Sequence, residues 1–127
     1  MIDHAHVERW LADYVSAWKS YDSAAIGALF SSDATYRYHP YDDEPLRGRE
    51  AVIASWLANR DKPNTYDAEY KPIAVDGNTA VAQGRTQYFA DDGKTLQREF
   101  HNLFVMRFDG EGYCTDFTEW YMQTPKS

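Results

Sequence analysis

The spacing of hydrophobic residues predicts helices in the first half of the chain. Over residues 4–21, apolar side chains recur every three or four positions, as on one face of an α-helix. These positions are Val7, Trp10, Leu11, Tyr14, Ala17, Trp18 and Tyr21. Asp22 or Ser23 can cap a second, shorter helix. REAVIASWLANR, residues 49–60, repeats the helical spacing, and DATYRYHPY before it reads as a short strand that stops at Pro40.

The second half of the chain predicts strands that follow one another. TYDAEYKPIAV ends at Asp76-Gly77, a strong hairpin signal, and TAVAQGRTQYFA comes next. Two more strands are expected in EFHNLFVMRFDGEGYCTDFTEWY. Gly84, in the middle of its strand, either lets the sheet curve or is a weak point in it. Helices first and a meander afterwards indicate one α+β domain over residues 1–127.

Alternation along the last two strands puts polar residues among aromatic ones. If a four-residue turn joins these strands, Asn102 faces Glu119 directly and is close enough to hydrogen-bond to it. The rings around them are Phe100, Phe104, Phe117 and Tyr121. A carboxylate on this inward face must be paired, hydrated or raised in pKa, because burial disfavours its charged form. Glu119 is therefore either a structural partner of Asn102 or a functional acid or base.

Composition excludes several classes of protein. The formal net charge is -7 and Lys and Arg do not cluster, so we expect no nucleic-acid partner. No apolar run approaches the roughly 18 residues of a membrane span, so we expect no membrane association. MIDHAHVERW predicts no signal peptide, and Cys114 is the only cysteine, so we expect a reducing, cytoplasmic location. Aromatic residues are 16% of the chain, which favours a ring-rich core or a ring-lined cavity.

The order of these segments resembles a known superfamily. A helix with Trp10, Tyr14 and Trp18 precedes YDSAAIGALFSSDATY, GREAVIASW and the closing NLFVMRFDGEGYCTDFTEWY. Over nearly the whole chain this layout is similar to the nuclear transport factor 2-like superfamily, and within it to the SnoaL-like branch. The resemblance implies a cone-shaped, cystatin-like α+β barrel, with three N-terminal helices packed on a strongly curved, mostly antiparallel sheet. It also implies a pocket between helices and sheet, and a homodimer formed through the outer face of the sheet.

The catalytic residues of the ketosteroid isomerases in this superfamily carry over only in part. Tyr14 stands where the resemblance places an oxyanion-hole tyrosine. The aspartate base of those enzymes precedes a proline, and here His39, or Tyr38 if the alignment shifts by one residue, takes that place. Their second oxyanion donor, an aspartate before VMRF, is replaced by Phe104. We therefore do not expect a steroid isomerase.

Two other enzymes of this fold match at isolated positions. Tyr21-Asp22 resembles a tyrosine–aspartate pair of scytalone dehydratase, although Asp22 also suits a helix cap. Epoxide hydrolases of this fold use an aspartate–arginine–aspartate relay, and Arg98 is present in REF without the matching aspartate. The resemblance therefore transfers no complete mechanism.

For each of two candidate residues, His39 and Tyr14, two interpretations stay open. His39 is either a general base, a role that imidazole often takes in enzymes, or a residue that faces water at the end of a strand. Tyr14 donates a hydrogen bond to a developing oxyanion, or it belongs to the core. No residue spacing matches a metal, phosphate or nucleophile motif, so we expect neither a metal nor an organic cofactor.

The sequence thus predicts a pocket for a small, hydrophobic, oxygenated molecule. If the protein is an enzyme, Tyr14, His39 and Glu119 would catalyse isomerisation, dehydration or cyclisation by acid–base chemistry. The residues expected to bind the substrate are Trp18, Tyr38, Trp56, Tyr88, Phe100, Asn102, Phe104, Phe117 and Tyr121. Two alternatives stay open: a binding module that uses the same pocket without catalysis, and a dimerising interaction domain whose cavity is incidental.

Overall fold

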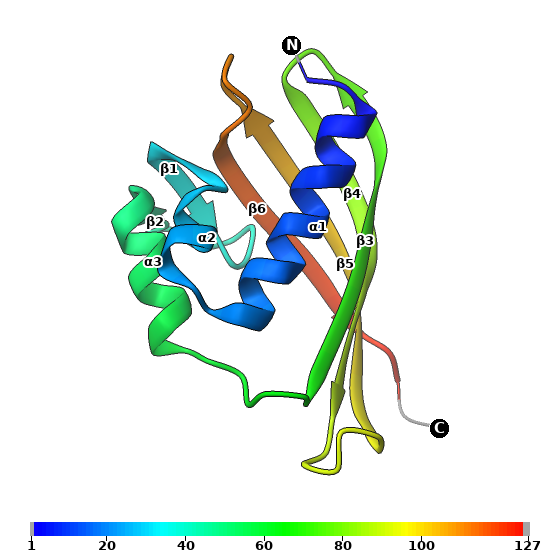
Figure 1. Ribbon diagram of the computed structural model, residues 1–127. Coiled ribbons are helices and arrows are strands. Elements are labelled where there is room, and N and C mark those ends of the chain that lie inside the picture. Colours follow the sequence, from blue (N-terminus) through cyan, green and yellow to red (C-terminus); the bar gives the residue numbers. More distant parts are fainter. Residues whose placement is uncertain (1, 126–127) are drawn as a thin grey trace.

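The computed structural model describes residues 2–125, and its helices lie where the sequence predicts them (Figure 1). They are α1 (His4–Ser20), α2 (Ser23–Gly27) and α3 (Arg49–Ala58). The Asp3 carboxylate accepts a hydrogen bond from the backbone N–H of His6 and so caps α1, and Asp22 caps α2 in the same way. Tyr21 ends α1 in the left-handed conformation, with φ at 49°.

Six strands form one curved sheet in the order β2-β1-β6-β5-β4-β3. They are β1 (Phe30–Arg37), β2 (Leu46–Arg47), β3 (Tyr66–Asp76), β4 (Thr79–Phe89), β5 (Leu96–Phe108) and β6 (Cys114–Gln123). β1 runs parallel to β6, and the other neighbouring pairs are antiparallel. The α+β class and the mostly antiparallel sheet are confirmed. Within residues 2–125 the edge strands β2 and β3 do not pair with each other, so the sheet stays open. The sequence pattern predicted no strand at β2.

The last hairpin has a register two residues away from the predicted one. Phe104 pairs with Glu119 and Asn102 pairs with Tyr121, so Asn102 and Glu119 are diagonal rather than direct neighbours. The predicted four-residue turn was wrong, because the turn is one residue longer and Thr115 is an extra residue in β6. A shift of two residues keeps every side chain on its predicted face. Asn102 and Glu119 therefore both still face inward.

Gly84 lies where β3 and β4 approach each other closely. It pairs with Tyr70 on one side and Asn102 on the other, with no bulge at this point. A Cβ atom here would lie 2.7 Å from the Cα of Tyr70 and would also clash with the carbonyl oxygen of Glu69. The missing side chain thus leaves room for the backbone and ring of Tyr70. The two expectations for Gly84, a point of curvature or a weak point, both stay predictions.

α1 crosses the inner face of the sheet and covers a core of aromatic rings (Figure 1). The ring centroid of Trp10 lies 5.7 Å from that of Phe108 and 6.1 Å from that of Phe117. Phe104 and Phe117 are 1% and 0% exposed, and the Tyr14 ring packs 5.4 and 5.7 Å from them. The prediction that these two phenylalanines contact substrate is therefore corrected, because α1 buries them in the core.

The outer face of the sheet carries exposed hydrophobic side chains. Trp120 is 41% exposed and Met122 is 76% exposed. The homodimer expected through this face stays a prediction. None of the helices within residues 2–125 is long and apolar enough to cross a bilayer.

Candidate active-site cavity

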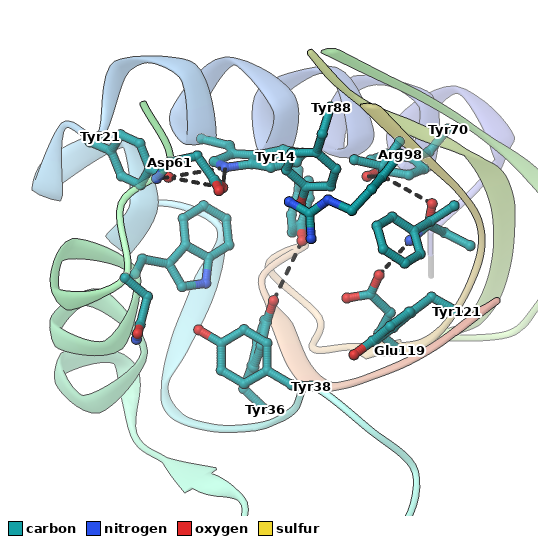
Figure 2. Close-up of a pocket in the computed structure, with 16 residues that line it drawn as sticks. Tyr14, Tyr21, Tyr36, Tyr38, Asp61, Tyr70, Tyr88, Arg98, Glu119 and Tyr121 are labelled. Atoms are coloured by element: carbon teal, nitrogen blue, oxygen red, sulfur yellow. Dashed lines mark hydrogen bonds between the residues drawn. The ribbon is translucent and has the colours of Figure 1, made fainter. Parts of the chain in front are cut away.

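A cavity of about 590 Å³ lies between α1, α3 and the inner face of the sheet (Figure 2). Nine of the predicted site residues line it: Tyr14, Trp18, Tyr38, Trp56, Tyr88, Phe100, Asn102, Glu119 and Tyr121. The other lining residues are Tyr21, Tyr36, Asn59, Asp61, Tyr70, Thr86 and Arg98. Most of the wall is aromatic and a few polar groups converge on it, which is the usual composition of a small-molecule site.

A directed chain of hydrogen bonds runs from β3 across β4 and β5 and ends at Glu119 on β6. The Thr86 hydroxyl donates to Asn102 Oδ1 at 2.9 Å, and Asn102 Nδ2 donates to Glu119 Oε2 at 2.6 Å. Because the single hydroxyl hydrogen of Thr86 is already used, the Tyr70 hydroxyl is the donor in its 2.5 Å bond to Thr86. Every donor therefore points toward the carboxyl of Glu119, which fixes the position of that side chain.

Glu119 is an acid whose protonation changes near neutral pH. Burial desolvates its carboxyl group and raises the pKa to about 7, and the hydrogen bond from Asn102 offsets this rise only in part. The second carboxyl oxygen points into the cavity (Figure 2). At neutral pH Glu119 is thus present in both protonation states, so it can accept a proton from a bound molecule and can also return one.

Two buried tyrosines face each other on another wall of the cavity. The hydroxyl oxygens of Tyr14 and Tyr36 lie 3.4 Å apart, at the distance of a weak hydrogen bond (Figure 2). Burial is the main reason that the pKa of each hydroxyl is raised well above its usual value, so both stay protonated. Whichever hydroxyl donates to the other, one hydrogen remains for a ligand oxygen.

A cluster of hydrogen-bonded side chains lies where the end of α1 meets the segment after α3. The Trp18 indole N–H donates to Asp61 Oδ2 and to the Tyr21 hydroxyl, both at 3.1 Å. The backbone N–H of Asp61 donates to the Tyr21 hydroxyl at 2.7 Å. These contacts fix the Trp18 ring, which stacks on Tyr66 with 4.4 Å between the ring centroids.

His39 does not line the cavity but touches a residue that does. Its Nδ1 lies 3.2 Å from Asp42 Oδ1, and its Nε2 lies 2.7 Å from the Tyr121 hydroxyl. A carboxylate only accepts hydrogen bonds, so in the neutral imidazole Nδ1 carries the hydrogen and Nε2 accepts from Tyr121. His39 is thus a loop residue next to the cavity and contacts the lining residue Tyr121. Its role as a general base stays a prediction.

Several lining residues were not predicted, and some of them left a signal in the sequence. Thr86 lies two positions before Tyr88 on the same face of β4, so the period of a strand places it on the wall. Tyr70 reaches the cavity because Gly84 leaves space for it, and this requires knowledge of how β3 pairs with β4. Asp61 lies in a connecting segment with no such period, and only the folded chain brings it to the site.

Metal ligands and a reactive cysteine are not part of this site. Within residues 2–125, no three His, Cys, Asp or Glu side chains are grouped so that they could hold a metal ion. Cys114 is buried in the core, and burial raises the pKa of its thiol far above the usual value. The groups that the cavity offers for chemistry are therefore two carboxyls, hydroxyls, amides and one guanidinium.

Comparison with known proteins agrees with this fold. An NTF-2 like protein of unknown function from Burkholderia xenovorans has a similar structure, with a TM-score of 0.71 and 17% sequence identity. The match covers 97% of this chain and 88% of that chain. The protein therefore has the nuclear transport factor 2-like fold.

The sequence comparison assigns a family within that fold. The family model described as the SnoaL-like domain matches residues 11–113. The chain thus belongs to the SnoaL-like family, as its segment order suggested. A search of curated proteins found no match.

Proposed function

We propose that the protein binds a small, hydrophobic, oxygenated molecule in this cavity and transfers a proton to or from it without a cofactor. Isomerisation, dehydration and aldol-type cyclisation all belong to this chemistry. One observation carries the proposal: Glu119 ends a chain of donors, is held by Asn102 at 2.6 Å, and has a pKa of about 7 inside an aromatic cavity. A carboxyl kept only for folding would gain nothing from this environment, because burial opposes its ionisation.

The proposed step divides the work between two walls of the cavity. Glu119 removes a proton from a ligand C–H bond, and the electron pair of that bond delocalises onto a neighbouring carbonyl oxygen of the ligand. The Tyr14 and Tyr36 hydroxyls, 3.4 Å apart, then donate a hydrogen bond to the oxygen where negative charge develops. Glu119 returns the proton at another carbon or to a leaving hydroxyl. The aromatic wall holds the ligand and limits the access of water.

A second candidate function is ligand binding without turnover. It is favoured by Phe104, which is buried where the resemblance to isomerases places a second oxyanion donor. With only the tyrosine pair as donors, a bound molecule would be held next to Glu119 with less stabilisation of a developing charge.

Deuterium exchange separates the two functions without knowledge of the natural substrate. A panel of hydrophobic ketones and enones is incubated with the protein in D₂O, and NMR follows the loss of protons next to the carbonyl group. We expect at least one bound compound to exchange faster than in buffer, and Glu119→Gln to remove this effect while binding persists. Trp120→Ala, on the outer face, is the control that should exchange like the parent. Binding of panel members without any exchange would exclude the enzyme and leave the binding module.

A further inference from the structure

We propose that Arg98 selects a ligand that carries an anionic group, such as a carboxylate or sulfonate, on a hydrophobic or aromatic body. This inference rests on the proposed function, because it assumes that a ligand occupies the cavity. Arg98 is the one lysine or arginine among the residues that line the cavity within the described chain. It is therefore the group of this lining that can attract an anion by its charge.

The guanidinium of Arg98 is held by rings of the cavity wall. Its central carbon lies 4.7 Å from the ring centroid of Tyr88 and 5.9 Å from that of Phe100. A guanidinium that rests on an aromatic face is fixed by cation–π attraction, while the N–H groups at its edge stay available to an oxyanion. In Figure 2 the group extends over the cavity rather than away from it. Arg98 is also an exposed residue, so its guanidinium lies on these rings where a ligand from solvent can reach it.

Arg98 takes part in none of the ion pairs that the described residues form. Within residues 2–125, no carboxylate oxygen lies within 4.0 Å of its guanidinium, whereas Arg85 on the neighbouring strand reaches Glu99 at 4.0 Å. Arg49 gives a second contrast, because its Nε donates to the Phe30 carbonyl at 2.9 Å and so supports the backbone. An arginine that lines a cavity, stacks on its rings and pairs with no acid among residues 2–125 is suited to an acid from outside.

The two carboxyl groups of the cavity already have partners of their own. Glu119 accepts from Asn102, and Asp61 accepts from Trp18. The anionic group of a ligand would therefore bind at Arg98 on β5. The uncharged, reactive part of the same ligand would then lie near Glu119 on β6. The net charge of the protein is -7, so its overall field repels anions and does not create a preference for them. Any preference for an anionic ligand must come from a local cation.

Two fluorescent dyes test this inference because they share one ring system and differ by a sulfonate. They are anilinonaphthalene sulfonate and its uncharged parent, phenylnaphthylamine. We expect the parent protein to bind both, and Arg98→Gln to weaken binding of the sulfonate about tenfold, the effect of one charge-assisted hydrogen bond. Affinity for the uncharged dye should change less than about twofold. Arg85→Gln is the matched control that removes a positive charge from the neighbouring strand and should leave both affinities unchanged.

Each other outcome has a defined meaning. If both dyes bind the parent protein and Arg98→Gln changes neither affinity, or weakens both equally, the inference about Arg98 is overturned and the proposed function stands. If neither dye binds, the cavity is not a ligand site, and the proposed function fails together with the inference. Trp120→Ala reports on dye bound at the outer face: if this variant loses the sulfonate dye and Arg98→Gln does not, the inference is overturned. The unfolding midpoint of each variant verifies that it is folded.

Discussion

The two ends of β5 have the same alternation of inward and outward side chains, but different parts of the molecule cover their inner faces. At one end Phe104, Met106 and Phe108 are fully buried in the aromatic core beneath α1. At the other end Phe100 and Asn102 border the cavity. Alternation determines which side chains of a strand face inward. The helices above them then decide whether an inward side chain becomes core or cavity wall.

The same difference appears in the polar groups. The core end contains rings that pack against one another. The ring centroids of Phe104 and Phe117, for example, lie 4.8 Å apart. The cavity end contains the chain from Tyr70 to Glu119, whose hydrogen bonds all point one way and stop at a carboxyl. The ring packing at the core end stabilises the fold. The hydrogen-bonded chain at the cavity end positions a carboxyl that can exchange a proton. Substitutions at the two ends should therefore have different effects.

The largest expected effect is the loss of a core ring. Phe104→Ala removes a fully buried side chain and should lower the free energy of unfolding by roughly 3–5 kcal/mol. Phe100→Ala, four residues away on the same face, should lower it by about 1 kcal/mol, because that ring is only half-buried. Urea denaturation measures both. Equal losses would show that the two ends of β5 are packed alike and would contradict the comparison.

A smaller effect is expected where the two ends meet, at Gly84. Gly84→Ala places a methyl group against the backbone of Glu69 and Tyr70, and it should destabilise the protein by roughly 1–3 kcal/mol. It should also displace the Tyr70 ring from Thr86, which a change in the chemical shifts of Thr86 and Asn102 would report. Gly110→Ala is the control, because a Cβ atom there meets no atom within 4 Å. If Gly84→Ala is as stable as the parent, the close approach of β3 and β4 is not a constraint.

These two ends also show what the sequence could and could not predict. Hydrophobic spacing located the helices and placed Asn102 and Glu119 on the inner face, since both properties depend on local periods of 3.6 and 2. It failed for the register of the last hairpin, because the extra residue Thr115 has no signal in the pattern. It also placed Phe104 and Phe117 in the cavity, because alternation carries no information about where α1 crosses the sheet.

The cavity residues likewise divide into those that a local period predicts and those that only the folded chain positions. Residues on the wall that belong to strands or helices, such as Trp18 and Tyr88, were predictable from their period. Asp61 and the contact between His39 and Tyr121 were not, because each depends on a loop that is positioned only by the folded chain.

Another expected effect on stability, at Glu119, depends on pH. The folded protein binds the proton of Glu119 more tightly than the unfolded chain does, because the pKa rises from 4.5 to about 7 on folding. This contribution to stability is complete below about pH 4.5 and is lost as the pH rises through 7. Glu119→Gln stays neutral, so it should match the parent at pH 4 and be more stable by roughly 1–2 kcal/mol at pH 8.

Glu99→Gln is the matched control on β5. Hydrogen bonds from Gln87 and Thr124 lower the pKa of Glu99, so this carboxylate stabilises the folded state above its unfolded pKa and loses that effect as the pH falls. Its substitution should therefore not stabilise the protein at pH 8. Thermal unfolding at both pH values measures the two variants. A Glu119→Gln variant that is less stable than the parent at pH 8 would favour a structural role for the pair with Asn102.

The most direct test of a proton-exchanging carboxyl in the cavity is an NMR titration of Glu119. Carbon-detected spectra of the protein between pH 3 and pH 9 report the side-chain carboxyl carbon of each glutamate, and Glu119→Gln assigns the resonance by its absence. We predict a midpoint near 7 for Glu119. A midpoint near 4.5, the ordinary value, would mean that the carboxyl is already ionised and hydrated at neutral pH. That result would contradict the role of Glu119 as the acid and base of this cavity.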